Sequence, residues 1–378
     1  MRRDGELYEI TTFRSDHEYA DHRRPHRVEF TSTIELDLVR RDFTVNAMAW
    51  GARSGEAPEM IDPHDGRADI AARVLRAVGD PSVRFDEDAL RMIRAVRLAT
   101  TLGFSIEPAT LAGIEAGAPL VTHLSGERIA TELWRLLEAP VPSVGLRLLS
   151  DTGLLAAISA DLAAQRGIPQ NKLPDEDLWD HTLRSVDAAP ASRPIVRLAA
   201  LVHDIGKPAT FADGHFLGHE AEGARLAGGF LERLRAPHAV RDRVVDLVGN
   251  HMFSYESTWS DAAVRRFIAR IGTLGEGALG ELLALREADN AGSGLPPEAG
   301  RLGELKARIA AELAADAVLD RRGLAVDGSD LMAELGLPQG PLLGRILEGL
   351  LERVIADPAL NDRPTLLLVA RSMVPDAT

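Results

Sequence analysis

The stretch LVRRDFTVNAMAW, residues 38–50, places a polar cluster at the start of an apolar run. Arg40 and Arg41 offer two planar guanidinium groups, Asp42 a carboxylate and Asn46 an amide. Guanidinium groups match the oxygens of a phosphate, and a carboxylate can accept a hydrogen bond from a sugar hydroxyl. The cluster therefore predicts contacts with the ribose and phosphates of a nucleotide. A solvated strand end with an incidental ion pair is the alternative that this stretch alone leaves open.

Two further motifs follow in order: IDPHDGRADI at 61–70 and RFDEDALRMIRAVRLA at 84–99. With the first stretch they resemble the RRDFT-x-NA and DP-x-x-G-x-x-D motifs of bacterial tRNA nucleotidyltransferases and poly(A) polymerases, in the DNA polymerase β superfamily. The segment ERIATEL at 127–133 resembles another motif of that family. The resemblance implies an enzyme that adds CCA to tRNA 3′ ends from CTP and ATP without a nucleic-acid template, with Arg41 and Asp42 on ribose and phosphate.

The segment DEDALR contains an acidic and a basic residue, Asp88 and Arg91, three positions apart. On a helix they would share one face. Cytosine and adenine both present an exocyclic amine beside an unprotonated ring nitrogen, so a carboxylate next to a guanidinium complements both bases, whereas uracil and guanine have the opposite polarity. We therefore expect Asp88 and Arg91 to select the base, and an ordinary surface ion pair is the alternative.

The motif that opens the family's catalytic domain is a Gly-rich turn, GG-x-VRD, followed by a D-x-D pair that holds Mg²⁺. The resemblance places it before Leu7, where this sequence has no such motif. Glu9 matches a third acidic position of the family, although an outward-facing strand residue would suit that position equally. Two-metal transfer needs carboxylates on both ions. The sequence therefore leaves open whether the chain as given is active in transfer, and we expect a truncated gene model, with a natural catalytic remnant as the competing explanation.

Histidines and acidic residues form a second set in the following part of the chain. Neutral imidazoles and carboxylates that converge from separate helices suit a divalent transition metal, and six of them could hold two ions. The order of the set, H…HD…H…H…D, resembles the HD phosphohydrolase superfamily, which implies attack of a metal-bound water on phosphate esters, with Lys207 neutralising a phosphate. The expected ligands are His181, His203, Asp204, His219, His251 and Asp289.

Composition limits the partners and the location. The net charge of −14 over 378 residues argues against a broad basic RNA-binding face, so we expect only a local phosphate-binding stripe on two predicted helices. The absence of cysteine suits a reducing cytoplasm, and no apolar run approaches the length of a membrane span. We predict a cytoplasmic protein with no membrane association. The residues expected to bind RNA are Arg94, Arg97 and Arg128.

The pattern predicts an α+β fold that is mostly α: a partial polymerase β-like palm sheet at the N-terminus, followed only by helices. Strands are expected at 7–13 and 44–50, and a single helix at 84–102 with Leu90, Ile93, Val96 and Leu98 on its buried side. Further helices are expected at 127–137, 324–337 and 341–355. The domains expected are a partial nucleotidyltransferase head (1–70), a helical neck for base and RNA binding (71–150), a helical linker with the HD domain (151–295) and a C-terminal helical tRNA-binding region (296–378).

Rival functions follow from the same motifs. Poly(A) polymerases and partial CC- or A-adding enzymes share the nucleotide-binding segments, and the joined HD domain favours CCA addition over them. From another class, the chain could be only a metal-dependent phosphohydrolase, because its HD set is intact while the D-x-D pair is lacking. A tRNA-binding module without chemistry is the third interpretation. The sequence does not indicate the oligomeric state.

Overall fold

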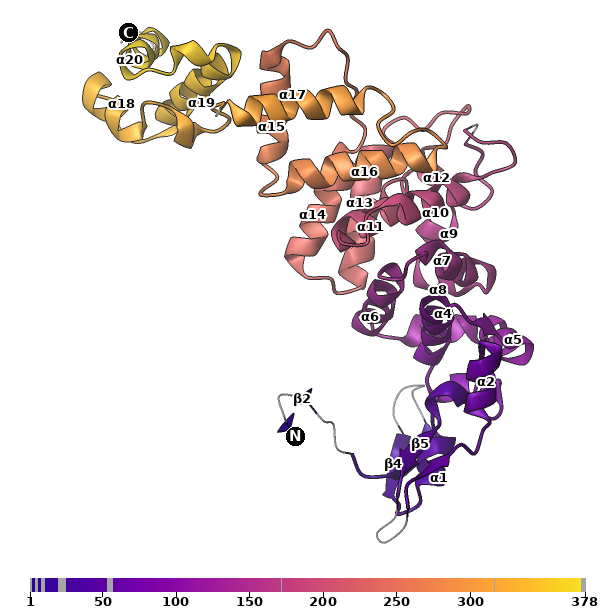
Figure 1. The fold of residues 1–378 in the computed structure, drawn as a ribbon. Coiled ribbons are helices and arrows are strands. Elements are labelled where there is room, and N and C mark those ends of the chain that lie inside the picture. Colours follow the sequence, from indigo (N-terminus) through magenta and orange to yellow (C-terminus); the bar gives the residue numbers. More distant parts are fainter. Residues whose placement is uncertain are drawn as a thin grey trace.

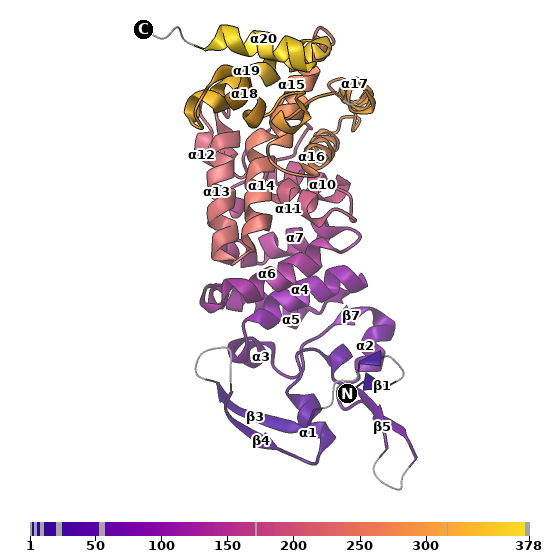
Figure 2. The same ribbon diagram turned by 90° about the vertical axis from the view of Figure 1, so that its left-hand side faces the viewer.

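The computed structural model describes residues 2–3, 6–7, 11–19, 25–52, 57–170, 172–315 and 317–374. These residues form an elongated molecule in which the strand-containing head and the C-terminal helices lie at opposite ends (Figure 1). Helices stack one after another between the two ends (Figure 2). The expected class, α+β and mostly α with a small N-terminal sheet, is confirmed. No helix among the described residues is long and apolar enough to cross a membrane.

The head contains short antiparallel strand pairs rather than one broad sheet. Each of the first six strands pairs with its neighbour in the chain. Helix α1 lies between the second and third pairs in the chain. The elements are β1 (Arg2–Arg3), β2 (Glu6–Leu7), β3 (Arg14–Tyr19), β4 (Pro25–Phe30), α1 (Ile34–Val39), β5 (Ala49–Gly51) and β6 (Glu59–Ile61).

Both expected head strands are wrong in their bounds. Of residues 7–13, Leu7 belongs to β2, residues 8–10 lie outside the described residues, and residues 11–13 precede β3. The expected strand at 44–50 is a 3₁₀ turn, η1 (Thr44–Asn46), followed by the short β5. Side-chain bonds bend this segment: Asp42 Oδ1 accepts from Phe43 N at 2.9 Å and from Asn46 Nδ2 at 3.1 Å. These local bonds compete with the sheet ladder, as Asp and Asn side chains commonly do.

The neck is a stack of helices with one short parallel strand pair. The expected single helix at 84–102 is wrong, because the chain breaks between α3 and α4 at Asp88, which has extended torsion angles of φ −150° and ψ 102°. Its carboxylate accepts a hydrogen bond from Leu90 N at 3.1 Å, so it satisfies a free amide at the start of α4. The elements are α2 (Gly66–Ala72), β7 (Val74–Leu75), α3 (Pro81–Glu87), α4 (Leu90–Leu102), β8 (Ser105–Ile106), α5 (Pro108–Gly117), η2 (Ala118–His123), α6 (Gly126–Leu137) and α7 (Pro142–Asp151).

The middle of the molecule is entirely helical among the described residues, and α10 packs against α11 and α16. One continuous apolar core extends from Phe43 in the head to Ile309 in α17, so neck and middle share buried side chains. The elements are α8 (Leu154–Ile158), α9 (Ala160–Ala163), α10 (Leu178–Ala188), α11 (Pro194–Val202), α12 (Lys207–Thr210), α13 (His219–Arg233), α14 (His238–Asn250), α15 (Asp261–Gly272), α16 (Ala278–Gly292) and α17 (Leu302–Ala314).

The C-terminal helices have a core of their own, formed by apolar residues between Leu324 and Ala370. The helix expected at 324–337 is shorter than predicted, since α18 covers only 328–335, whereas the helix expected at 341–355 is present as α19, which begins at Pro341 directly after Gly340, as the Gly-Pro pair predicts. The elements are η3 (Arg321–Gly323), α18 (Gly328–Leu335), α19 (Pro341–Ala356), η4 (Pro358–Leu360) and α20 (Arg363–Met373).

Candidate nucleotide pocket and metal centre

A pocket of about 500 Å³ lies where the end of α1, the 42–46 turn, the break between α3 and α4, and α6 meet. All six residues expected to bind nucleotide line it, together with Arg94 and Arg128 of the expected RNA-binding set. Five guanidinium groups face two carboxylates among the described lining residues, so the pocket favours an anion with several charges. The lining residues are Arg40, Arg41, Asp42, Asn46, Asp88, Leu90, Arg91, Arg94 and Arg128.

One buried carboxylate, Asp37 on α1, holds the two arginines of the RRDFT motif. Its Oδ1 accepts from Arg40 Nη2 at 2.6 Å and its Oδ2 from Arg41 Nη2 at 2.9 Å. Burial opposes ionisation, but the hydrogen bonds from Arg40, Arg41 and the backbone of Arg14 outweigh it and lower the pKa of Asp37. The sequence analysis missed Asp37, although its position three and four residues before the arginines was the available signal.

Asp42 is held inside the pocket wall by bonds to its own turn and to α4. Besides the bonds to Phe43 N and Asn46, its Oδ2 lies 2.5 Å from Arg94 Nε. The turn that follows is fixed from behind, because Thr44 Oγ1 donates to the buried Asp69 at 2.7 Å. Asp69 belongs to the IDPHDGRADI motif, so the first two sequence motifs are joined by this bond. The bond between Thr44 and Asp69 thereby fixes the turn that carries the pocket residues Asp42 and Asn46.

Asp88 and Arg91 both line the pocket, but the ion pair between them that was the alternative does not form, and they do not share one helix face as expected. Arg91 Nη1 pairs with Glu87 at 2.7 Å. Both oxygens of the Asp88 carboxylate instead accept from Arg128 Nη2, at 3.0 and 2.7 Å, in addition to the bond from Leu90 N. The break at Asp88 takes its side chain off the helix face of Arg91, which explains the difference. The Asp88 carboxylate and the Arg91 guanidinium therefore line the pocket while each is paired with a different residue.

One more expected residue of this site, Arg97, does not line the pocket. Arg97 pairs with the buried Glu132 of α6 at 2.5 Å and is absent from the described pocket lining. Glu9 lies outside the described residues. In the described head, Asp37, Asp42 and Asp69 are each bonded to an arginine, and the described His and acidic groups that could jointly hold a metal all lie in the middle of the molecule.

All six residues of the expected HD set converge in that middle part, from α10, the α11–α12 junction, α13, the end of α14, and α16. Two triads share the buried Asp204. In the first, Asp204 Oδ2 lies 3.2 Å from Nε2 of both His181 and His203. In the second, Asp204 Oδ1 lies 3.5 Å from His219 Nε2 and 3.7 Å from His251 Nε2. The sixth residue, Asp289, has its Oδ1 3.3 Å from His181 Nε2.

Three of the histidines are oriented by backbone carbonyls. The Nδ1 atoms of His203, His219 and His251 lie 2.7–2.8 Å from carbonyl oxygens one turn earlier in the chain. A carbonyl can only accept, so each Nδ1 carries a proton, and in the neutral imidazole that a metal requires each Nε2 then keeps its lone pair. The Nε2 atoms of His219 and His251 are buried without a hydrogen-bond partner among the described residues. This is the arrangement by which proteins prepare imidazoles for a metal.

Electrostatics keep the carboxylates ionised. Burial would raise the pKa of Asp204, but the charges of His203 and Lys207 hold that pKa well below its usual value. Burial is likewise outweighed at Asp289, where His181 and the nearby cations lower the pKa. Burial lowers the pKa of His219, which favours the neutral imidazole that a metal requires. The cluster thus offers charged oxygens and at least one neutral nitrogen to a divalent ion.

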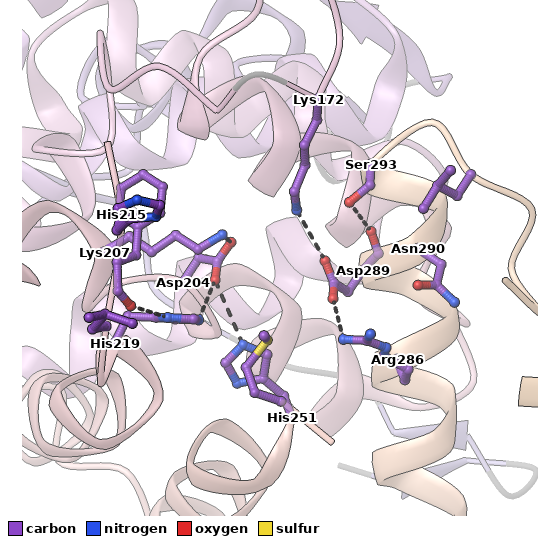
Figure 3. A pocket seen from close by; sticks show the side chains of 14 residues that line it. Lys172, Asp204, Lys207, His215, His219, His251, Arg286, Asp289, Asn290 and Ser293 are labelled. Atoms are coloured by element: carbon purple, nitrogen blue, oxygen red, sulfur yellow. Dashed lines mark hydrogen bonds and ion pairs between the residues drawn. The ribbon is translucent and has the colours of Figure 1, made fainter. Parts of the chain in front are cut away.

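A cavity of about 530 Å³ opens onto this cluster (Figure 3). Two cations that the sequence analysis did not single out line it: Lys172, from the segment before α10, and Arg286, on α16. Lys172 Nζ lies 3.7 Å from Asp289 Oδ1, and Arg286 Nη1 lies 3.2 Å from Asp289 Oδ2. The spacing Arg-x-x-Asp on α16 was a usable signal for Arg286, whereas nothing local in the sequence places Lys172 here.

Comparisons with known proteins match several family models to the chain. Family models described as "Poly A polymerase head domain" and "HD domain" match residues 1–76 and 155–292. A further model described as "Probable RNA and SrmB- binding site of polymerase A" matches residues 103–165. The A-adding tRNA nucleotidyltransferase of Deinococcus radiodurans is 34% identical over 345 residues, which cover 86% of this chain and 76% of that protein. The chain belongs to the tRNA nucleotidyltransferase family.

Other members of the tRNA nucleotidyltransferase family match a shorter part of the chain. The CCA-adding enzyme of Geobacillus thermodenitrificans is 48% identical over 151 residues, 40% of this chain and 36% of that enzyme. Among solved structures, the Bacillus stearothermophilus CCA-adding enzyme in complex with CTP is similar over 98% of this chain and 80% of that chain, with a TM-score of 0.64 and 28% identity. The family uses a divalent metal for its reaction.

Proposed function

We propose that this chain adds C, C and A to the 3′ end of tRNA from CTP and ATP, in the cytoplasm and without a nucleic-acid template. The observation that carries the proposal is the single pocket of five arginines into which Asp88 and Arg91 both project. Similarity to CCA-adding enzymes, one of them solved with CTP, supports it. Because one relative is an A-adding enzyme, the experiment must distinguish addition of C, C and A from addition of A alone.

Base selection follows from the chemistry of two side chains. The Asp88 carboxylate can only accept hydrogen bonds and the Arg91 guanidinium can only donate them. Cytosine and adenine supply an amine for the first and a ring nitrogen for the second, whereas uracil and guanine supply neither in that order. Arg40 and Arg41 then contact the phosphates, and Asp42 with Asn46 the ribose. Binding of the base and binding of the phosphates are thus assigned to different parts of one pocket.

We propose Mg²⁺ as the metal of the transfer step. The described head residues do not form a fitting site for it, because Asp37, Asp42 and Asp69 are each already bonded to an arginine. Glu9 remains a proposed contributor outside the described residues.

We propose tRNA as the macromolecular partner. Arg94 and Arg128 at the pocket and Arg97, on the same helix as Arg94, are the proposed RNA contacts, and the helices after residue 296 are the proposed contact for the tRNA body. The divisions at residues 70, 150 and 295 are likewise proposals. The proposed boundary at 295 does not coincide with the start of a separate apolar core: the core of the C-terminal helices begins at Leu324, and residues up to Ile309 belong to the core of the middle part.

A primer-extension assay tests the proposed activity. Residues 1–378 are incubated with tRNA lacking its 3′ CCA, Mg²⁺, and labelled CTP and ATP. We expect successive incorporation of C, C and A, lost in Asp88→Ala and retained in Arg135→Ala, whose exposed side chain lies on the same helix as Arg128. Incorporation of A alone on tRNA ending in CC would convert the proposal to A addition. Failure to bind either nucleotide would reject it.

We propose a second activity, metal-dependent hydrolysis of phosphate esters, for the HD cluster. Its support is the set of six converging ligands with two buried, unbonded imidazole nitrogens. His181, His203, Asp204 and Asp289 would hold one divalent transition metal, and His219, His251 and Asp204 a second. The metals would supply an activated water at neutral pH. Metal analysis of the purified protein tests this: we expect up to two bound ions, reduced in His203→Ala, and a metal-free wild type would overturn it.

A further inference from the structure

The cavity above the HD cluster contains an excess of fixed positive charge. Among the described residues that line it, three cations, Lys172, Lys207 and Arg286, face two carboxylates, Asp204 and Asp289. The two carboxylates would also serve as metal ligands, so each divalent ion bound there increases the excess. A cavity with these walls favours a ligand that brings more than one negative charge.

The cations lie on two sides of the cavity (Figure 3). Lys207 lies 2.7 Å from Asp204 on one side, while Lys172 and Arg286 lie beside Asp289 on the other. The Lys207 side chain is 9% exposed, that of Arg286 24% and that of Lys172 31%, so the three heads are largely removed from bulk water. Charges screened so little by solvent attract an anion more strongly than surface lysines would.

The mouth of the cavity has a different character. Leu217, Met252 and Leu295 line it and are 86%, 54% and 52% exposed, and Phe216 lies under the Lys207 ammonium group at 5.3 Å. A rim of exposed apolar side chains around a charged floor suits a ligand with an organic part beyond its anionic end. Inorganic phosphate would leave this rim unused.

From this geometry, and resting on the hydrolase function proposed above, we infer that the HD cavity selects organic phosphomonoesters over phosphodiesters, with Lys172 and Arg286 as the residues that recognise the second negative charge. A monoester carries a charge of about −1.5 to −2 at neutral pH, and a diester carries only one charge. In the reaction, water adds to phosphorus and the P–O bond to the alcohol breaks. The alcohol leaves with a proton and the products are alcohol and inorganic phosphate, so no other reactant is needed.

A matched pair of substrates, p-nitrophenyl phosphate and bis(p-nitrophenyl) phosphate, tests the selection. We expect the metal-loaded chain to hydrolyse the monoester with the higher kcat/KM. Lys172→Ala and Arg286→Ala should each lower that value for the monoester by roughly 10- to 100-fold, the size of one lost charge-assisted hydrogen bond, and change the diester value less. Lys172→Arg should recover part of the loss. Preference for the diester, or equal loss on both substrates, would overturn the inference.

Binding is measured independently of turnover through lysine NMR, because the chain has only three lysines. With ¹³C-labelled lysine and Zn²⁺-loaded or EDTA-treated protein, added inorganic phosphate should shift the signals of Lys172 and Lys207. Lys306, which pairs with Glu287 and Glu298 outside the cavity lining, serves as the internal control and should not shift. A Lys172 signal that does not respond would overturn the anion subsite. Shifted signals without hydrolysis of either ester would reject the hydrolase function and leave the subsite standing.

Discussion

At the scale of single residues, the charged side chains of the nucleotide pocket already form ion pairs within the protein when no ligand is bound. Asp88 is held by Arg128 and Arg91 by Glu87, so the two groups proposed to read the base are each fixed by a partner within the protein. Fixed groups lose less conformational freedom on binding than mobile ones. Discrimination between bases should therefore depend on Arg128 and Glu87 as well as on Asp88 and Arg91.

Arg128→Ala tests this dependence. Without the guanidinium, the Asp88 carboxylate loses the bonds at 3.0 and 2.7 Å that hold it toward the pocket. We expect affinity for CTP and ATP to fall roughly tenfold, the size of one to two kcal/mol of lost orientation, and the preference over UTP to narrow. Isothermal titration with the four nucleotides measures both, with Arg135→Ala as the control on the same helix. Unchanged preference in Arg128→Ala would show that Asp88 needs no support.

Asp37 gives the pocket a pH dependence. Its folded pKa is lowered, so its contribution to stability is fully present above its unfolded pKa, near 4, and is lost as the pH falls through the lower folded value. Asp37→Asn should destabilise the protein by roughly 1–3 kcal/mol at pH 7. The difference in unfolding free energy between wild type and variant should shrink below about pH 4. A difference that stays constant from pH 7 to pH 3 would contradict this account.

At the scale of elements, the HD cluster requires a close approach between α12 and α13. A Cβ atom on Gly206 would lie 2.3 Å from His219 O and 2.5 Å from Gly223 N, both backbone atoms that cannot yield cheaply. Gly206→Ala should therefore separate the two helices and move His219 away from Asp204. Gly206 is part of the sequence HDIGKP, so this motif supplies the glycine that lets α12 and α13 approach closely as well as the expected metal ligands His203 and Asp204.

We expect Gly206→Ala to lose at least one bound metal ion and to unfold at a lower temperature than the wild type. Gly229→Ala, on the outer part of α13, is the matched control, because its added Cβ would meet only Arg233 Nη1 at 4.0 Å. That control should be neutral or slightly stabilising, since alanine favours helix over glycine by up to about 1 kcal/mol. Equal metal content in both variants would show that the close approach is not required.

Sequence reasoning succeeded where the signal was a spacing of chemical groups and failed where long-range contacts decided local structure. The six HD residues could be listed because their order is informative at any distance. The apolar pattern predicts one helix over 84–102 because it continues across Asp88, whereas the bonds of the Asp88 carboxylate to Leu90 N and to Arg128, forty residues later, stabilise a break there. No sequence pattern predicts Lys172 at the cavity, since nothing in the segment before α10 indicates that Asp289 lies beside it. The turn at 44–46 was read as strand for a similar reason, because Asp69 fixes it from a distance.

At the scale of the whole molecule, the C-terminal helices form a unit with its own core that is fastened to the middle by buried polar contacts. Arg265 on α15 is 8% exposed and donates to Ile355 O at 2.7 Å and Ala356 O at 3.2 Å at the end of α19. Its third bond, at 2.9 Å, goes to Glu312 on α17. One side chain thus joins three helices from both cores.

Arg265→Ala should uncouple the C-terminal unit, because it leaves two carbonyls and a carboxylate without their donor, at a cost of roughly 3–5 kcal/mol. We expect calorimetry to show a separate, earlier unfolding transition and amide exchange to rise in α19 and α20. Arg266→Ala is the control, since its side chain is 49% exposed and pairs with an exposed glutamate, Glu352. A single unshifted transition in Arg265→Ala would show that apolar contacts alone hold the unit.

The central claim is that one pocket distinguishes C and A from U and G through Asp88 and Arg91. The most direct measurement is the affinity of residues 1–378 for CTP, ATP, UTP and GTP, in the wild type and in Asp88→Asn. Asparagine keeps the shape but adds an amide donor, so we predict that CTP and ATP bind more tightly than UTP and GTP to the wild type and that the difference collapses in Asp88→Asn. Equal affinity for all four nucleotides in the wild type, or an unchanged preference in the variant, would contradict the account.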